Sequence, residues 1–334
     1  GKEIVLGDIV AIPKLESTIA GDTLGVKGEV LQFRPIKFPK PVYSVAVFPK
    51  SRADEDKLGN AITKMLKEDR TLSFVKNPET NDAVLSGMGD MHLDIMLSKI
   101  KERYKVDLDT RTPKVPYRET IKKKASAQGK HKKQSGGRGQ YGDVWFELAP
   151  LDKNAGIEFI DRVVGGVVPK NYIPAAEKGL REAAARGFLA GYPATDFSCA
   201  IFDGSYHDVD SSEMAFKIAA SIAFKKCMEQ ANPILMEPVM NVEVTVPEEC
   251  LGDVMGDFNS RRGRIMGIDS EGKLQIVKAQ CPLSEMFRYA IILRSMTSGR
   301  GSFSMEYSHY EEVPGDIAKK VIEQAAQERK EEEE

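Results

Sequence analysis

The same order of predicted strands and helices occurs twice in this chain, and this repetition limits the fold more than any single motif does. Residues 42–112 read as a strand, a helix, a two-stranded hairpin, a second helix and a last strand. Residues 239–311 repeat that order. A β-α-β-β-α-β order is typical of a ferredoxin-like unit, and two such units in one chain indicate an internal duplication. Ferredoxin-like folds carry many functions, so the topology alone does not identify one.

The spacing of apolar residues supports these assignments. In the helix predicted at 51–69, Leu58, Ile62 and Met65 fall on one face, with the period of an amphipathic helix. The other helices predicted in the two units span residues 90–104, 247–259 and 284–296.

The residues between the two units, 113–238, predict a different α/β domain. A helix predicted at 174–186 ends at Gly187. Asp210 and Glu213 have the spacing of a capping box, which predicts Asp210 as the N-cap of a further helix. Strands are predicted at 145–148, 157–160 and 195–202.

Both ends of the chain differ from these domains. Residues 1–37 contain short strand-like runs separated by Gly-Asp turns, which predicts a β-barrel remnant. Residues 317–330 predict a helix, and we expect the acidic residues 331–334 after it to be disordered.

Composition narrows the class of protein further. With 334 residues, 41% of them hydrophobic and 29% charged, the chain is expected to form several globular domains. No apolar run approaches the roughly 18 residues that a membrane span needs, and no signal peptide is recognised, so we expect a cytoplasmic protein without a membrane partner. The four cysteines are far apart in the sequence, which predicts buried thiols and no metal site.

A basic stretch in the middle domain is the first candidate functional site. Residues 118–142 contain eight lysines and arginines and one acid, Glu119, while the whole chain has a formal charge of −2. This local excess favours a polyanion, and a phosphate backbone in particular, as the partner. Tyr141 and His131 offer rings for stacking on bases. The alternative is a solvated, mobile loop tip without a partner.

Residues 137–144 match the pattern G-x-G-x-x-G-x-V of nucleotide-binding loops, but their surroundings argue against that function. A dinucleotide-binding loop follows a strand and opens a helix, whereas here a lysine-rich stretch precedes and an alternating strand follows. The sequence also lacks the other kinase motifs and the phosphate loop G-x-x-x-x-G-K-[ST]. We therefore predict no catalytic residues in this chain.

Residues 203–210 form a second dense polar stretch. Ser205, His207 and Asp208 are residue types of a hydrolase triad, but neighbours this close in a loop rarely reach triad geometry. His207 lies among polar residues, and a structural role competes evenly with stacking on, or hydrogen bonding to, a nucleic acid.

Four further basic residues are candidates for phosphate contacts. Lys170 lies in a glycine-rich loop and is either a backbone contact or simply solvated. Arg261, Arg262 and Arg264 lie at a predicted helix-to-strand turn. Arginine suits phosphate groups, but pairing with aspartates of the preceding helix turn is an equal alternative.

Seven stretches together resemble elongation factor G, the ribosomal translocase of bacteria and organelles. They occur in order over almost the whole chain, and the stretches at 136–142 and 203–216 are highly specific. The seven stretches are SGMGDMHLD at 86–94, VPYRET at 115–120, GGRGQYG at 136–142, VGGVVPK at 164–170, DGSYHDVDSSEMAF at 203–216, GDFNSRRG at 256–263 and GRGSF at 299–303.

The resemblance implies an α+β multidomain fold. Two ferredoxin-like domains would flank an α/β domain similar to the second domain of ribosomal protein S5, after a β-barrel remnant. The implied division is the end of domain II at 1–37, domain III at 38–113, domain IV at 114–235, domain V at 236–313, and a C-terminal helix and acidic tail at 314–334.

The resemblance also implies a function, namely GTP-dependent translocation of tRNA and mRNA during translation elongation. The partners would be the ribosome, with its RNA and proteins, A-site tRNA and mRNA, and the factor would act as a monomer. GTP and Mg would belong to the intact protein, a translational GTPase, because the GTP-binding domain is absent from this sequence. A recycling or organellar paralogue stays open, since residues 129–134 are unusually basic, and so does a free-standing RNA-binding module.

The residues implied to act in this function fall into two groups. Arg261, Arg262 and Arg264 would contact the RNA of the large subunit. The residues implied to contact the decoding centre, tRNA or mRNA are Lys130, Lys132, Lys133, Gly136, Gly137, Arg138, Gly139, Gln140, Tyr141, Lys170, Ser205, Tyr206, His207 and Asp208.

Overall fold

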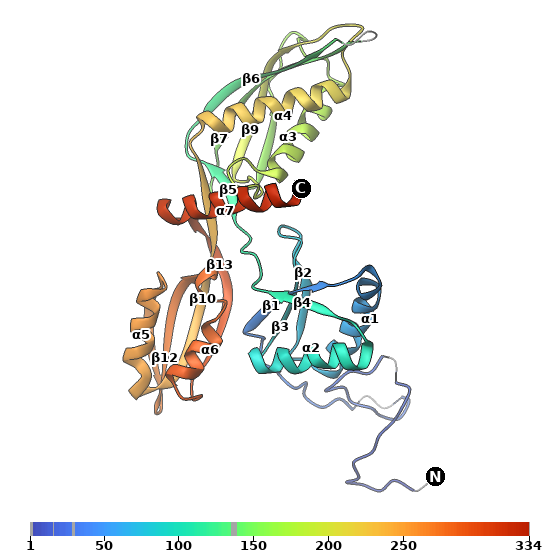
Figure 1. The fold of residues 1–334 in the computed structure, drawn as a ribbon, viewed down its shortest axis with the longest axis vertical. Helices are drawn as coiled ribbons and strands as arrows, with labels where there is room; N and C mark the ends of the chain where they lie inside the picture. Colours follow the sequence, from blue (N-terminus) through green and yellow to red (C-terminus); the bar gives the residue numbers. More distant parts are fainter. Residues whose placement is uncertain (1–2, 16, 29–30, 135–138, 334) are drawn as a thin grey trace. The chain divides into compact units, whose positions relative to one another are not determined.

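The computed structural model describes residues 3–15, 17–28, 31–134 and 139–333 of the chain. The chain divides into two compact units, residues 1–114 with 287–304 and residues 115–286 with 305–334. The protein is an α+β protein, and its described residues form three β-sheets (Figure 1).

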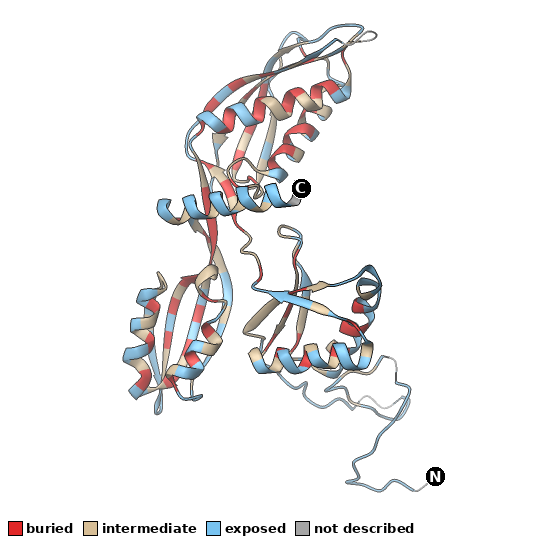
Figure 2. Cartoon of the chain, viewed as in Figure 1, coloured by how far each residue is buried: buried red, intermediate tan, exposed pale blue. Residues whose placement is uncertain are grey.

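The first unit contains a complete β-α-β-β-α-β domain, as predicted. Its sheet has the antiparallel order β2-β3-β1-β4. Helix α1 begins after Ser51, whose Oγ accepts the N–H of Asp54. The apolar faces of both helices are buried in one core with the sheet (Figure 2). The elements are β1 (Tyr43–Pro49), α1 (Arg52–Glu68), β2 (Ser73–Lys76), β3 (Ala83–Gly87), α2 (Asp90–Tyr104) and β4 (Leu108–Arg111).

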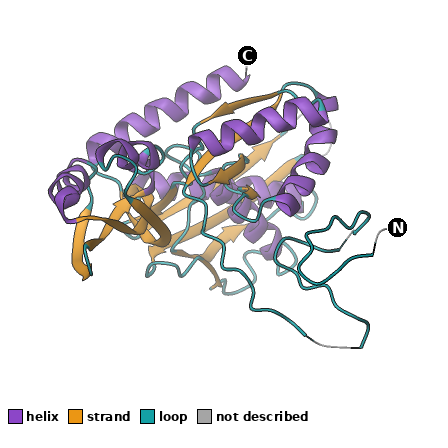
Figure 3. Ribbon diagram, turned by 90° about the horizontal axis from the view of Figure 1, so that it is seen from below, coloured by secondary structure: helices purple, strands orange, loops and turns teal. Residues whose placement is uncertain are grey.

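The strands predicted within residues 1–37 are wrong for the described part of this segment. Between residues 3 and 42, the described residues form no strand, and the segment leading from the N-terminus is drawn as loop in Figure 3. Most of its described apolar side chains are exposed, among them Leu6 and Ile9. A strand needs a hydrogen-bonding neighbour, and the described residues of this chain provide none for this segment.

The second unit begins with a domain built on the sheet β6-β7-β9-β8, called the middle domain below. The first three strands are antiparallel, and β8 runs parallel to β9. Helices α3 and α4 contact each other, and α4 packs on β6 and β7 (Figure 1). The elements are β5 (Arg118–Ile121), β6 (Ala125–Lys133), β7 (Gln140–Pro150), β8 (Ile157–Asp161), α3 (Ile173–Arg186), β9 (Phe197–Ser205) and α4 (Glu213–Gln230).

Two expectations for the middle domain are corrected. We expected the basic, glycine-rich residues 122–142 to be a loop, but residues 125–133 form β6 and residues 140–142 begin its partner strand β7. The N-cap of α4 is Ser212, not Asp210: Ser212 is extended, and its Oγ accepts the N–H of Ala215 at 3.2 Å. The physical reason is that Asp210 is already paired with the β6–β7 hairpin, because its carbonyl accepts the N–H of Tyr141.

The second β-α-β-β-α-β order is also present. Its sheet has the order β11-β12-β10-β13. Strand β10 is long enough to pair with β5 through its first residues and with β12 through its last. The elements are β10 (Pro233–Pro247), a 3₁₀ turn (Glu248–Cys250), α5 (Leu251–Ser260), β11 (Arg264–Glu271), β12 (Leu274–Pro282), a second 3₁₀ turn (Leu283–Glu285), α6 (Tyr289–Met296) and β13 (Ser302–Glu312).

The helix predicted at 284–296 is shorter than expected, because α6 begins only at Tyr289. The carbonyl of Glu285 accepts a hydrogen bond from the guanidinium of Arg261. That carbonyl would otherwise accept the N–H of Tyr289 in a continuous helix, so the arginine favours the break.

Helix α7 (Gly315–Glu333) ends the described chain and includes residues 331–333, which we expected to be disordered. Its residues Ile317, Val321 and Ile322 pack against a small core that contains Tyr117 and Leu235. None of the described helices is both long enough and apolar enough to span a bilayer.

Candidate nucleic-acid interface

The two stretches that the sequence singled out lie side by side at one end of the middle domain. Strand β7 pairs with β9 so that Asp143 is opposite Ser205, where β9 ends. The backbone N–H of Tyr141 donates to the carbonyl of Asp210 at 2.9 Å, and that of Gly139 donates to the Asp210 carboxylate at 3.0 Å. We call residues 130–134, 139–142 and 205–210 the tip.

A chain of hydrogen bonds holds the tip from beneath. The Tyr141 hydroxyl and Ser205 Oγ are 2.7 Å apart, and Ser205 Oγ donates to Asp143 Oδ2 at 2.7 Å. Gln128 Nε2 donates to the other carboxylate oxygen at 2.8 Å. The Asp143 side chain is buried. Sequence reasoning missed Asp143 and Gln128, because only the strand register brings them to Ser205.

The hairpin presents its basic side chains to solvent. Lys130, Lys132 and Lys133 are exposed, and Lys130 Nζ is 5.4 Å from the centre of the Tyr141 ring, a cation–π distance. Gln140 Oε1 lies 2.9 Å from Nε2 of His131. Among the described residues, Lys132 and Lys133 have no ion-pair partner. The predicted contacts Gly136, Gly137 and Arg138 lie outside the described residues.

The turn after β9 also exposes its polar side chains. Tyr206, His207 and Asp208 are exposed, and so is Lys170 in the loop before α3. The side chain of His207 is 57% exposed, and its ring centre is 6.4 Å from that of Tyr141. No hydrogen bond joins Ser205 to His207 in the described structure, and Ser205 instead donates to Asp143. The geometry therefore gives no support to a hydrolase triad.

The three arginines after α5 all pair with acids of the same unit. Arg261 forms an ion pair with Asp257 at 2.7 Å, which agrees with the alternative that this arginine pairs with an aspartate of the preceding helix turn. Arg264 contacts Glu311 at 3.2 Å and keeps 69% of its side chain exposed. Contact of these arginines with ribosomal RNA stays a prediction, and Arg264 has the most accessible guanidinium of the three.

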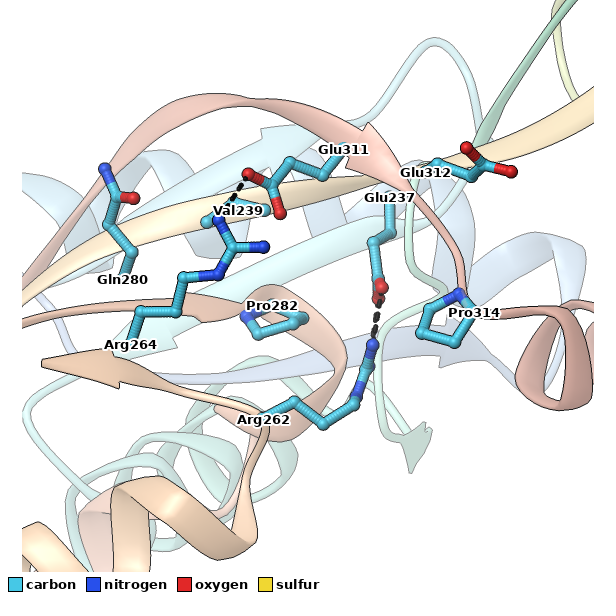
Figure 4. Close-up of a pocket in the computed structure, with 9 residues that line it drawn as sticks. All are labelled: Glu237, Val239, Arg262, Arg264, Gln280, Pro282, Glu311, Glu312 and Pro314. Atoms are coloured by element: carbon cyan, nitrogen blue, oxygen red, sulfur yellow. Dashed lines mark hydrogen bonds and ion pairs between the residues drawn. The ribbon is translucent and has the colours of Figure 1, made fainter.

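Arg262 is engaged more tightly. It donates to both carboxylate oxygens of Glu237, at 2.6 and 3.0 Å, and to Glu285 at 3.1 Å. Hydrogen bonding to Glu237 is the main cause that raises the pKa of Arg262. Arg262 and Arg264 line a cavity of about 130 Å³ with Glu237 and Glu311 (Figure 4). The cavity is also lined by Glu312, so two arginines face three glutamates and the cavity offers no surplus of positive charge for a phosphate.

The other residue types considered for chemistry are structural. All four cysteines are buried, and burial raises the pKa of Cys199 well above its ordinary value. Within the described residues, no group of three His, Cys, Asp or Glu side chains is placed to hold a metal ion. The tip is therefore the candidate functional site.

The fold and the site together define a multidomain protein with an exposed basic hairpin. Comparison with known protein families identifies the family to which the chain belongs. Three models of elongation factor G match consecutive parts: domain III at residues 38–112, domain IV at 113–232 and the C-terminus at 234–321. The chain belongs to the elongation factor G family. The three matched domains do not include the GTP-binding domain of the family.

A solved structure supports the same relationship. The crystal structure of a protein from Thermus thermophilus is 46% identical in sequence to this chain, with a TM-score of 0.77. The match covers 87% of this chain and 44% of that protein, so the chain spans less than half of the length of this relative.

Proposed function

We propose that this chain is the ribosome-binding portion of an elongation factor G and promotes GTP-dependent translocation of tRNA and mRNA. The observation that supports this best is the convergence at the tip. Exposed lysines of the hairpin and the exposed imidazole of His207 lie at one end of the middle domain, joined through Asp210. Membership in the elongation factor G family supports tRNA and mRNA as the proposed substrates.

The proposed mechanism is steric and electrostatic. Lys130, Lys132, Lys133 and Lys170 neutralise phosphates as the tip enters the A site of the small subunit. Tyr206 and His207 offer rings and a hydrogen-bonding group to splayed bases or the RNA backbone. The hydrogen bonds beneath Ser205 let the tip fill the site without rearranging, so that tRNA and mRNA can move only forward.

The other proposed partners follow from the same assignment. GTP and Mg bind in the GTP-binding domain of the intact factor. The residues of this chain do not contact the nucleotide and depend on it only through that domain. Arg264 contacts RNA of the large subunit. The factor acts as a monomer in the cytoplasm.

Salt-dependent ribosome binding tests whether the hairpin meets phosphates. The double variant Lys132→Gln, Lys133→Gln should bind ribosomes more weakly, and the slope of log affinity against log salt should fall by roughly 0.7–0.9 for each phosphate that the variant no longer neutralises. Lys225→Gln, at the exposed C-terminal part of α4, is the matched control and should leave the slope unchanged. Equal slopes for wild type and the double variant would contradict the proposed phosphate binding.

Kinetics in the intact factor test the role in translocation. His207→Ala should slow the movement of tRNA and mRNA and leave GTP hydrolysis on the ribosome nearly unchanged, because the tip lies outside the GTP-binding domain. Equal loss of both activities would argue against a role of the tip in movement. If the intact factor splits post-termination ribosomes and does not translocate, the chain belongs to a recycling paralogue.

A further inference from the structure

The imidazole of His207 is held by the backbone of its own turn. The backbone N–H groups of Val209 and Asp210 both point at Nδ1, with N···N distances of 3.4 and 3.3 Å. The N–H of His207 donates to Ser211 Oγ at 2.9 Å, which closes the turn on the other side. Nδ1 is therefore placed to accept hydrogen bonds from the turn.

This arrangement decides which ring nitrogen carries the proton. A neutral imidazole has one donor nitrogen and one acceptor nitrogen. A proton on Nδ1 would face two N–H donors, so the neutral ring carries its proton on Nε2. Within the described residues Nε2 has no hydrogen-bond partner, and the side chain is 57% exposed. The donor that the turn creates is thus available to another molecule.

Asp210 connects this imidazole to the hairpin. Its backbone N–H donates to Nδ1 of His207, its carbonyl accepts the N–H of Tyr141, and its carboxylate accepts the N–H of Gly139. A Cβ on Gly139 would lie 2.9 Å from that carboxylate, so the backbone approaches it closely. The carboxylate is 3.6 Å from Nδ1, too far for a direct hydrogen bond. Asp210 therefore acts on the imidazole mainly through its backbone.

We propose that Asp210 is a positioning residue that fixes His207 as the Nε2–H tautomer, and that the tip donates this N–H to an acceptor atom of the bound RNA. The proposal deepens the function proposed above and depends on it for the identity of the partner. A neutral imidazole can offer RNA either a hydrogen-bond donor or a hydrogen-bond acceptor. The proposal assigns His207 the role of donor.

Nitrogen NMR of the protein without RNA tests the first half of the proposal. At a pH at which the spectrum itself shows a neutral imidazole, His207 should show a protonated Nε2 and an unprotonated Nδ1. The His207→Gln spectrum assigns the signals. Asp210→Asn keeps an acceptor for Gly139 and should preserve the tautomer. Asp210→Ala keeps the backbone N–H that donates to Nδ1 but loses the acceptor that ties the turn to Gly139, so the turn should loosen and yield a mixture of tautomers. A protonated Nδ1, or a mixture in the wild type, would overturn the assignment.

Two amide substitutions test the second half on ribosomes. The side-chain amide of His207→Gln can place an N–H near the position of Nε2, while the shorter amide of His207→Asn reaches only the position of Nδ1. The glutamine variant should translocate within about threefold of wild type, and the asparagine variant should be as slow as His207→Ala, by about three- to tenfold for the loss of one hydrogen bond. If His207→Asn translocated at the wild-type rate while His207→Gln was slow, the assignment of Nε2 as the donor would be overturned.

The two halves fail in distinguishable ways. If NMR shows a mixture of tautomers while the lysine variants still weaken ribosome binding, this proposal is wrong and the proposed function stands. If NMR shows pure Nε2–H while none of the tip variants affects ribosome binding or translocation, the donor does not meet RNA, and the proposed function fails with the second half of the proposal.

Discussion

Glu119, the one acid in the basic stretch, organises a loop that is far from it in sequence. Its carboxylate is fully buried and accepts the backbone N–H groups of Phe188, Leu189, Ala190 and Tyr192, at 2.6 to 3.2 Å. A buried carboxylate is stable only when such donors replace water. Glu119 therefore holds the loop after α3 against strand β5.

Replacing this carboxylate by an amide should be costly. In Glu119→Gln one oxygen becomes an NH₂ group, which leaves two backbone N–H groups facing a donor in a buried site. We expect the free energy of unfolding to fall by about 2–4 kcal/mol, measured by urea denaturation. Glu158→Gln, at an exposed position of β8, is the control and should change it by less than about 0.5 kcal/mol. Equal effects of the two substitutions would show that the four hydrogen bonds contribute little.

Tyr117 should make the second unit sensitive to alkaline pH. Burial is the main cause that raises the pKa of Tyr117 to about 12, and the charge of Glu237 adds to it. The unfolded chain releases this proton near pH 10, so the stabilisation is complete below about pH 10 and is lost as the pH rises to about 12. In Tyr117→Phe that loss should be smaller, by up to about 1.4 kcal/mol between pH 9 and pH 11. Urea denaturation at both pH values measures it, and identical pH dependence of the two proteins would refute the assignment.

At the scale of elements, two glycines let the tip hairpin lie directly on helix α4. A Cβ on Gly129 of β6 would lie 2.0 Å from the carbonyl oxygen of Ala219, and one on Gly142 of β7 would lie 2.5 Å from that of Ala215. Both glycines thus permit a contact between strand and helix backbones. This close contact anchors the hairpin to α4 on the side towards the tip.

A methyl group at Gly129 should therefore separate strand from helix. We expect Gly129→Ala to lower the free energy of unfolding by at least about 1–3 kcal/mol, the usual cost of overpacking, and to increase amide exchange in β6 and α4. Gly59→Ala in α1 is a control of opposite sign. No atom lies within 4 Å of a Cβ there, and alanine in a helix should stabilise by about 0.5–1 kcal/mol. A stabilised Gly129→Ala variant would mean that the helix can move away at no cost.

The elements themselves could largely be predicted from the sequence, because periodicity and turn residues are local. Two of the predictions that failed did so because a distant group binds the backbone or side chain of the residue concerned. Asp210 looks like a cap for α4, but the hairpin occupies it, and Ser212 caps the helix instead. The shortened start of α6 depends on Arg261 in the same way. No local pattern could reveal such pairings.

In the candidate site, too, some residues could be predicted from the sequence and others could not. Exposed, chemically distinct residues such as His207 and Lys132 stand out from composition and motif. The supporting residues Asp143 and Gln128 do not, because their role depends on which residues of β6, β7 and β9 are opposite one another. Register is set by the pairing of whole strands, so the supporting hydrogen bonds need the structure.

At the scale of the whole molecule, strand β10 runs through the five-stranded sheet of the second unit and pairs with β5 near its start and with β12 towards its end. Leu235 pairs with Glu119 of β5, and Val242 pairs with Ala279 of β12. Helix α7 packs over this connection through Val321 and its neighbours. Lys122 and Glu312 form an ion pair at 2.6 Å across the same region. The continuity of β10 and the packing of α7 should together make β5, β10 and α7 unfold as one cooperative body.

Disrupting α7 tests this cooperative behaviour. Val321→Asp places a charge against the core that contains Tyr117 and Leu235, and we expect it to lower the free energy of unfolding of the second unit by about 1–3 kcal/mol. Hydrogen exchange should rise together in β5, in the loop that Glu119 holds and in the first residues of β10, because all of them contact or support this core. Exchange in the separate core of α1 and α2 should stay unchanged.

The control for this substitution is Gln324→Asp, which adds the same charge on the exposed face of α7 and should leave exchange in β5 and β10 as in the wild type. If Val321→Asp raises exchange only within α7 itself, the helix is an independent addition to the fold. The continuity of β10 would then have to hold β5 and β12 together alone, and a substitution that weakens the packing where β5 meets β10, such as Leu235→Ala, should separate the unfolding of β5 from that of β12.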